Sequence, residues 1–137
     1  MDKTYHIFIS HSWAHSDKYE KLISLLDKEP SFSYSTHFVP KNDPVHKKGT
    51  AKELYAAIKE EMNKSSVVLM LAGVYSTYNK WINKEIMISK YEFSTAKPII
   101  AVQPWGANFT SSAVKNAADK LVNWNPAAII DAIKELG

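Results

Sequence analysis

The chain contains no cysteine, which excludes disulfide bonds and thiolate metal ligands and leaves no sign of a secreted scaffold. Its longest apolar runs, such as Val67 to Ala72, are far too short to cross a lipid bilayer. The opening residues 1–4 read Met-Asp-Lys-Thr and lack the apolar region of a signal peptide. These absences predict a cytoplasmic protein that has no membrane partner.

The chain also lacks a large excess of positive or negative charge. The formal net charge is +3 at pH 7, and the positive residues are scattered along the chain. Lys41, Lys47 and Lys48 form a loose basic cluster outside the predicted helices. This cluster fits either a solvated loop or an electrostatic funnel for an anionic small molecule such as a dinucleotide. No basic stripe or recognisable module predicts a nucleic-acid partner.

Apolar residues are abundant enough for a real core, at 45% of the 137 residues, and the length fits one domain covering residues 1–137. Apolar or β-branched runs typical of strands alternate with helical periodicity about five times along the chain. This alternation predicts an α/β fold with a single doubly wound parallel five-stranded sheet and helices on both faces. We expect the flavodoxin-like strand order 2-1-3-4-5. The predicted strands cover residues 5–10, 32–39, 66–71, 98–102 and 120–122.

Two helix starts are marked clearly in the sequence. Thr50 and Glu53 have the spacing of a capping box, in which each side chain bonds the backbone of the other residue. Asn125 followed by Pro126 is typical of a capping residue with proline at the first helical position. Both patterns fix where the chain leaves a loop and enters a helix.

The predicted topology also indicates where a ligand binds. In such sheets the crevice lies at the carboxyl ends of the strands, where the strand order reverses, between strands one and three. Residues 10–13 and 72–75 are placed there. A helix then follows that carries Trp81 and Glu85, one turn apart on the same face. Their position, about 100° around the helix from Ile82 and Ile86, predicts a half-buried and still reachable pair. The apolar stripe predicted for this helix is Ile82, Ile86 and Phe93.

Taken alone, a tryptophan four residues before a glutamate is a weak signal. Ordinary packing beside a solvated acid explains most such pairs. The alternative is a partly dry pocket around a ligand that carries or develops positive charge. The rest of the sequence has to decide between the two interpretations.

Several other functions of this fold are excluded by inspection. A phosphoacceptor domain needs an aspartate at the end of the third strand, where this chain has Ala72 and Gly73. No glycine-rich phosphate loop, dinucleotide fingerprint or serine-hydrolase elbow is present. His11 and His15 are four residues apart, but a zinc site needs further ligands and no acidic partner is obvious. We therefore predict no metal.

At this point the chain resembles a known family. Residues 5–12, Tyr-His-Ile-Phe-Ile-Ser-His-Ser, are similar to the first-strand box of Toll/interleukin-1 receptor (TIR) domains. Residues 75–85 resemble the segment that holds the TIR tryptophan and catalytic glutamate. Residues 97–106 and 122–125 resemble a bacterial TIR-like subgroup that includes proteins of Thoeris-type antiphage defence. The resemblance spans nearly the whole chain, and the fold it implies is the sheet predicted above.

The sequence departs from the family at two places. His6 stands where many TIR domains have an acid. The loop after the second strand contains Asn42-Asp43-Pro44, with Gly49 well downstream, in place of a compact Arg-Asp-x-x-Pro-Gly motif. In the family this loop helps to cover the ligand and mediates contacts between domains.

The resemblance implies cleavage of the nicotinamide–ribose bond of NAD, which is the substrate, with no cofactor and with Glu85 as the catalytic residue. One carboxylate suffices in physical terms, because the pyridinium leaves as neutral nicotinamide and needs no general acid, unlike an ordinary glycoside. A fixed carboxylate can then stabilise the oxocarbenium-like ribose. The expected product is ADP-ribose or a cyclic or modified form of it, read by a separately encoded effector. Self-association through TIR–TIR contacts is also implied.

Further NAD-contacting roles are predicted around this carboxylate, and each competes with an ordinary structural role. Phe8 faces either the core or nicotinamide, and the polar residues after the first strand either bond ribose or phosphate or cap the next helix. The predicted NAD-binding residues are Phe8, Ser10, His11, Ser12, Asn42, Asp43, Tyr75 and Trp81. Two other functions stay open, a TIR interaction module without turnover and a nucleotide-sensing module.

Overall fold

The architecture was analysed in a computed structural model, which describes residues 3–10, 13, 18–39, 49–71, 79–103 and 112–137. Five strands form one all-parallel sheet in the order β2-β1-β3-β4-β5. The predicted fold class and strand order are confirmed. The strands are β1 (Thr4–Ile9), β2 (Ser33–His37), β3 (Val67–Leu71), β4 (Ile99–Gln103) and β5 (Lys120–Asn123).

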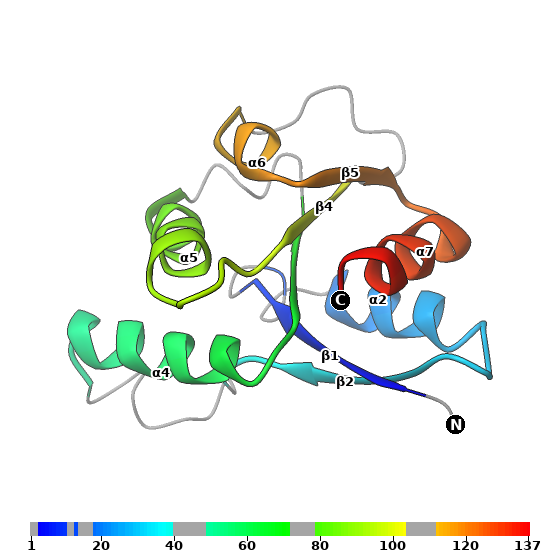
Figure 1. The fold of residues 1–137 in the computed structure, drawn as a ribbon, viewed down its shortest axis with the longest axis horizontal. Helices are drawn as coiled ribbons and strands as arrows, with labels where there is room; N and C mark the ends of the chain where they lie inside the picture. The colour runs from blue at the N-terminus through cyan, green and yellow to red at the C-terminus, as the bar shows by residue number, and fades with distance from the viewer. Residues whose placement is uncertain (1–2, 11–12, 14–17, 40–48, 72–78, 104–111) are drawn as a thin grey trace.

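Helices cover both faces of this sheet, as predicted. In Figure 1, α2 and α7 lie together on one side of the strands, while α4 and α5 lie on the other. The sequence did not predict α6, because a helix of six residues shows little more than one period of any pattern. The helices are α2 (Lys18–Leu26), α4 (Ala51–Asn63), α5 (Asn79–Tyr91), α6 (Ser112–Ala117) and α7 (Pro126–Leu136).

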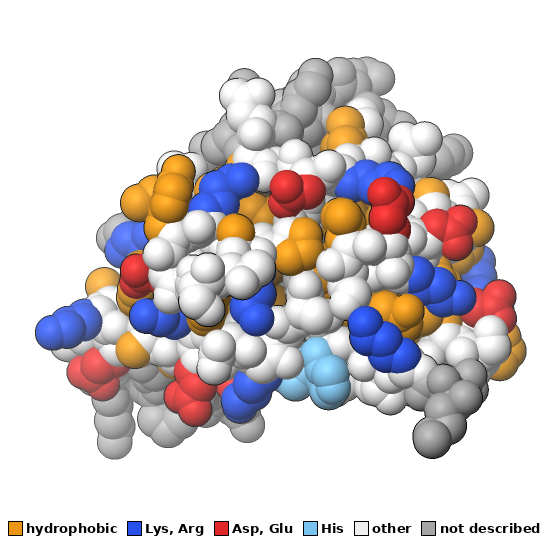
Figure 2. Space-filling view, in the orientation of Figure 1, with side chains coloured by type: hydrophobic (Ala, Val, Ile, Leu, Met, Phe, Trp, Pro, Cys, Tyr) orange, Lys and Arg blue, Asp and Glu red, His pale blue; other side chains and the backbone are white. Residues whose placement is uncertain are grey.

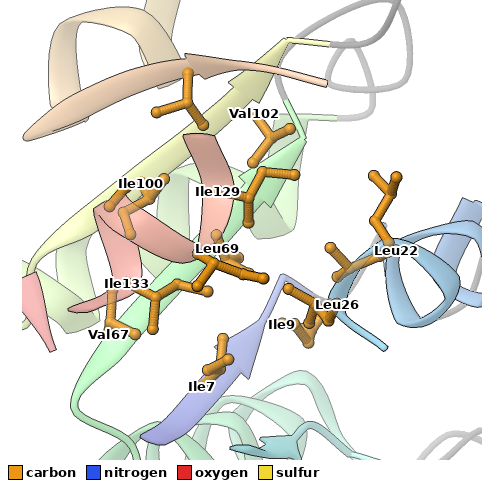
Figure 3. Packing of buried hydrophobic residues seen from close by; sticks show 14 of the residues in the cluster. Ile7, Ile9, Leu22, Leu26, Val67, Leu69, Ile100, Val102, Ile129 and Ile133 are labelled. Carbon is orange, nitrogen blue, oxygen red and sulfur yellow. The ribbon is translucent and has the colours of Figure 1, made fainter. Parts of the chain in front are cut away.

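The core is divided into two apolar layers by the sheet, because successive side chains of a strand point to opposite faces. Ile7 and Ile9 of β1 point toward α2 and α7, whereas Phe8 between them points toward α4 and α5. All five residues of β3 are buried, as expected for a central strand of a parallel sheet. Figure 3 shows the first layer, in which strand residues meet Leu22, Leu26, Ile129 and Ile133 from the two helices.

Both predicted helix starts are present. The Thr50 side chain accepts a hydrogen bond from the backbone N–H of Glu53 (3.1 Å), and the Glu53 carboxylate accepts one from the backbone N–H of Thr50 (3.4 Å). Asn125 accepts a bond from the backbone N–H of Ala128 (3.1 Å), and Pro126 follows at the first helical position. These caps satisfy donors that a helix leaves free at its amino end.

A pair of histidines joins the two strands at the β2 edge. His6 Nδ1 and His37 Nε2 are 3.0 Å apart, so at least one ring has to be neutral for the hydrogen bond to form. On the face drawn in Figure 2, lysine and acidic side chains are mixed, and histidine reaches the surface near the lower edge. The pKa of His37 is lowered from its usual 6.5, mainly because burial disfavours the charged ring and secondly because of the charge of His6.

This lowered pKa predicts a pH-dependent stability. Below pH 6.5 the unfolded chain binds a proton at His37 more readily than the folded chain does, so the free energy of unfolding falls as the pH decreases. We expect His37→Asn to lose less stability than the parent between about pH 8 and pH 5, the range over which histidine titrates. Urea unfolding of both proteins across this range measures the difference. Equal losses would contradict the prediction.

Candidate active site

Ser10 is the first residue after β1, at the carboxyl edge of the sheet. Its backbone N–H donates to the carbonyl of Leu69 in β3 (3.0 Å), which extends the pairing of the two strands by one residue. Ser10 has the same side-chain direction as Phe8, because both are even positions of one extended segment. Its side chain is therefore directed toward the layer that contains α4 and α5, and it is only 1% exposed.

Glu85 reaches the same place from α5. From residue 82 onward, the buried positions of this helix are Ile82, Glu85, Ile88 and Ser89, which are spaced as one face of a helix. Glu85 is 0% exposed. The prediction that Glu85 is half-buried at the edge of the buried face is therefore wrong.

The error came from the choice of apolar stripe. The predicted stripe includes Ile86 and Phe93, but Ile86 is only half-buried and Phe93 lies beyond the end of α5. A carboxylate in the middle of the stripe was not recognised because hydrophobic periodicity assigns polar residues to the outside.

The Ser10 hydroxyl donates a hydrogen bond to Glu85 Oε1 at 2.9 Å. This bond connects residues 75 positions apart in the sequence, and both partners are shielded from water. A buried carboxylate is costly unless hydrogen bonds or opposite charges compensate for its lost hydration. A carboxylate buried beside this mainly apolar layer is therefore a candidate for a chemical use.

Two tryptophans, Trp13 and Trp124, pack on the other face of the sheet, in the layer that contains α2 and α7. The backbone N–H of Trp13 donates to the carbonyl of Ser10 (3.0 Å), and the Trp13 indole donates to the carbonyl of Lys18 (3.2 Å). Trp13 is 1% exposed and packs at 6.1 Å, between ring centroids, against Trp124 after β5. Neither tryptophan has a predicted role. The signal in the sequence that could have indicated a role is their position, shortly after the ends of β1 and β5.

The structure brings together two of the predicted site residues, Ser10 and Glu85. Phe8 is 1% exposed and packs in the apolar layer beneath α4 and α5, so it is a core side chain here. Trp81 lies in the first turn of α5, and its side chain is outside the described part of the structure. The other predicted contacts, His11, Ser12, Asn42, Asp43 and Tyr75, lie outside the described residues.

Two surface hollows lie away from the Ser10–Glu85 pair. One, of about 560 Å³, is lined by α4 and by the segment that leads from α5 to β4. The other, of about 640 Å³, is lined by α2 and β2. Neither includes Ser10 or Glu85, so neither corresponds to the crevice that the topology predicts.

Among the described residues, no group of three or more histidine, aspartate or glutamate side chains is arranged to hold a metal ion. His11 and His15, considered as ligands above, are outside that part of the chain. The helices within the described ranges also include none with the length and apolar character that a bilayer span requires.

The sheet and the Ser10–Glu85 pair at its carboxyl edge define a class of protein. This class is a doubly wound α/β domain in which a buried glutamate accepts a hydrogen bond from the residue that follows the first strand. A family model described as "Thoeris protein ThsB, TIR-like domain" matches residues 8–109. The chain therefore belongs to the family of Thoeris ThsB TIR-like domains, as its motifs predicted. This membership supports a role in antiphage defence. No curated protein sequence matches the chain.

The matched segment contains both Ser10 and Glu85 and runs from the end of β1 to just beyond β4. The elements α6, β5 and α7 lie after it. They nevertheless belong to the same body, because β5 pairs with β4 and α7 packs in the layer shared with α2.

Proposed function

We propose that this chain is an NAD-consuming TIR-like enzyme that cleaves the nicotinamide–ribose bond and produces a nucleotide signal. The observation that carries the proposal is the buried Glu85 carboxylate, bonded to Ser10 at the carboxyl edge of the sheet. A protein that only provides a surface for assembly has no need to keep a carboxylate inside its core. The family match supports the same interpretation, since residues 8–109 include Ser10 at the end of the first-strand segment and the whole segment 75–85 that carries Glu85.

The chemistry balances with one carboxylate and water. The bond between ribose C1′ and the nicotinamide nitrogen breaks, and its electron pair leaves with nicotinamide, which becomes neutral. The ribose is left as an oxocarbenium-like cation, which the Glu85 carboxylate stabilises electrostatically. A water oxygen then bonds C1′ and releases a proton to solvent, which gives ADP-ribose. If an adenine nitrogen or a ribose hydroxyl of the same molecule attacks instead, the product is cyclic.

Complete burial of Glu85 has a consequence for turnover. A carboxylate that is 0% exposed does not touch a substrate until its surroundings open. Catalysis therefore requires a conformational change before NAD reaches Glu85. We expect low activity of the resting protein and higher activity once assembly or a trigger favours the open state.

The same burial is the observation that favours the second candidate function. If the surroundings of Glu85 never open, the domain acts as an interaction or nucleotide-sensing module, and the carboxylate is structural. Turnover of NAD distinguishes the two functions directly.

The test is to incubate the purified protein with NAD, both free in solution and clustered on vesicles through an affinity tag. Chromatography with mass detection then follows NAD, nicotinamide and the second product. We expect nicotinamide in equal amount to ADP-ribose, or to a cyclic form that is lighter by one water, with faster release from the clustered protein. Intact NAD after incubation with clustered, folded protein would favour the module.

A further inference from the structure

We infer that Ser10 is a positioning residue, which acts on the reaction through Glu85 and not by contact with NAD. This inference rests on the proposed function for its catalytic readout. Its direct support is the 2.9 Å hydrogen bond from the Ser10 hydroxyl to Glu85 Oε1, formed where both side chains are buried. Ser10 is among the NAD contacts predicted from the sequence, because its position after the first strand contains no information about its hydrogen-bond partner.

Ser10 is suited to this role because its backbone is held from two sides. Its N–H is part of the β1–β3 pairing through Leu69, and its carbonyl accepts a bond from the N–H of Trp13. Trp13 is in turn buried and bonded to the carbonyl of Lys18. The hydroxyl is thus attached to a backbone position that hydrogen bonds hold at the end of the β1–β3 pairing, which favours a fixed geometry for its side chain.

The bond has two effects on the carboxylate. It fixes one oxygen of Glu85, which limits rotation of the carboxylate plane and sets the direction of its other oxygen. It also stabilises the charged form of Glu85 relative to the neutral form, since the hydroxyl hydrogen is donated to an acceptor that protonation weakens. The reaction needs the charged form, because only that form stabilises the ribose cation.

A hydroxyl has one hydrogen to donate. In this structure that hydrogen is directed at Glu85, so it is not available as a donor to ribose or phosphate while the bond persists. A direct NAD contact and a positioning role therefore predict different kinetics. Loss of a direct contact weakens binding, whereas loss of a positioning contact slows the reaction of bound substrate.

The first experiment compares the parent with Ser10→Ala, Ser10→Thr and Ser10→Cys, using the clustered protein and NAD. Ser10→Ala should lower kcat by about 10- to 100-fold with KM unchanged, because misplacing a catalytic group costs up to about two orders of magnitude. The acidic limb of its pH–rate profile should move to higher pH. Ser10→Thr keeps the donor and should restore both. Raised KM with unchanged kcat would overturn the inference in favour of direct contact.

Ser89→Ala is the matched control. Ser89 is also buried on the core side of α5, but its hydroxyl donates to the carbonyl of Ile86 (2.9 Å). The Ser89→Ala change removes a buried hydroxyl from the same helix but keeps the hydrogen bond from Ser10 to Glu85. We expect kcat and the pH profile of Ser89→Ala to match those of the parent. An equal fall in kcat in both alanine variants would show a general effect on α5 and overturn the positioning role.

The second experiment does not depend on turnover. Carbon NMR of the side-chain carboxyl groups follows the titration of Glu85, assigned by its loss in Glu85→Gln. We expect the midpoint to rise by about one pH unit in Ser10→Ala, which is about tenfold in the ionisation constant. Ser10→Cys has a weak donor of similar size and should shift the midpoint in the same direction. This variant replaces Ser10→Ala in the test if the alanine variant does not fold. Parent-like midpoints in both variants would refute the inference even if NAD is cleaved. A parent protein that releases no nicotinamide refutes the proposed function instead, and the titration still decides the role of Ser10.

Discussion

Replacing Glu85 with glutamine is expected to lower the rate of nicotinamide release from NAD by about 100-fold or more, the usual cost of removing an electrostatic group from a transition state. Glutamine has the shape of glutamate, and its amide oxygen can still accept the hydrogen bond from Ser10. What it lacks is the negative charge that stabilises a ribose cation. The variant therefore separates the charge of residue 85 from its packing.

Folding should survive this change. A neutral amide in a buried position avoids the cost of dehydrating a carboxylate, so we expect a melting temperature equal to or above that of the parent. The measurement is nicotinamide release by clustered protein, together with a thermal unfolding curve. Glu60→Gln is the control, because Glu60 is exposed on α4 and the same chemical change there should leave the rate unaltered. If Glu85→Gln released nicotinamide at the parental rate, the mechanism would be wrong.

Leu69→Ala is expected to lower the free energy of unfolding by about 3 kcal/mol, within the usual range of about 2–5 kcal/mol for a large-to-small change in a core. Leu69 is 0% exposed and lies on β3, the strand at the centre of the sheet. It pairs with Ile9 on one side and with Ile100 on the other. Figure 3 shows its side chain at the centre of the apolar layer, beside Ile129 and Ile133 of α7. Little can move inward to fill the cavity, because strands enclose the site on both sides.

The control for this prediction is Leu121→Ala on β5. Leu121 is 43% exposed, so truncation removes little buried surface and should cost less than about 1 kcal/mol. Urea unfolding of the two variants and the parent gives the difference, provided that the slope with denaturant stays the same. Equal losses in the two variants would show that β3 does not form the centre of the core.

The sequence was sufficient for most of the fold because the local signals agree with one another. Five apolar runs separated by helical periods led to the strand order that the structure shows. The caps at Thr50 and Asn125 were readable because capping is a short-range interaction between a side chain and the next turn. The strand ends differ from the prediction by one or two residues, as at β2, where pairing with β1 ends at His37.

The candidate site was only partly readable from the sequence. Residue types and the family resemblance singled out Glu85, but periodicity placed it at the edge of α5 and half exposed. Its actual burial depends on how α5 is rotated against β1 and β3, and that rotation follows from packing along the whole layer. The contact with Ser10 was equally hidden, since it joins residues from separate elements.

By itself, the sequence determined the sheet and the order of its strands and singled out Glu85 as the candidate acid, because alternation, caps and short motifs act over a few residues of chain. Only the tertiary structure decided that this acid is enclosed in the core and bonded to the hydroxyl after β1. The reason is physical. Local propensity is set by neighbours along the chain, whereas the burial of a charge and the choice of its hydrogen-bond donor are set by neighbours in space.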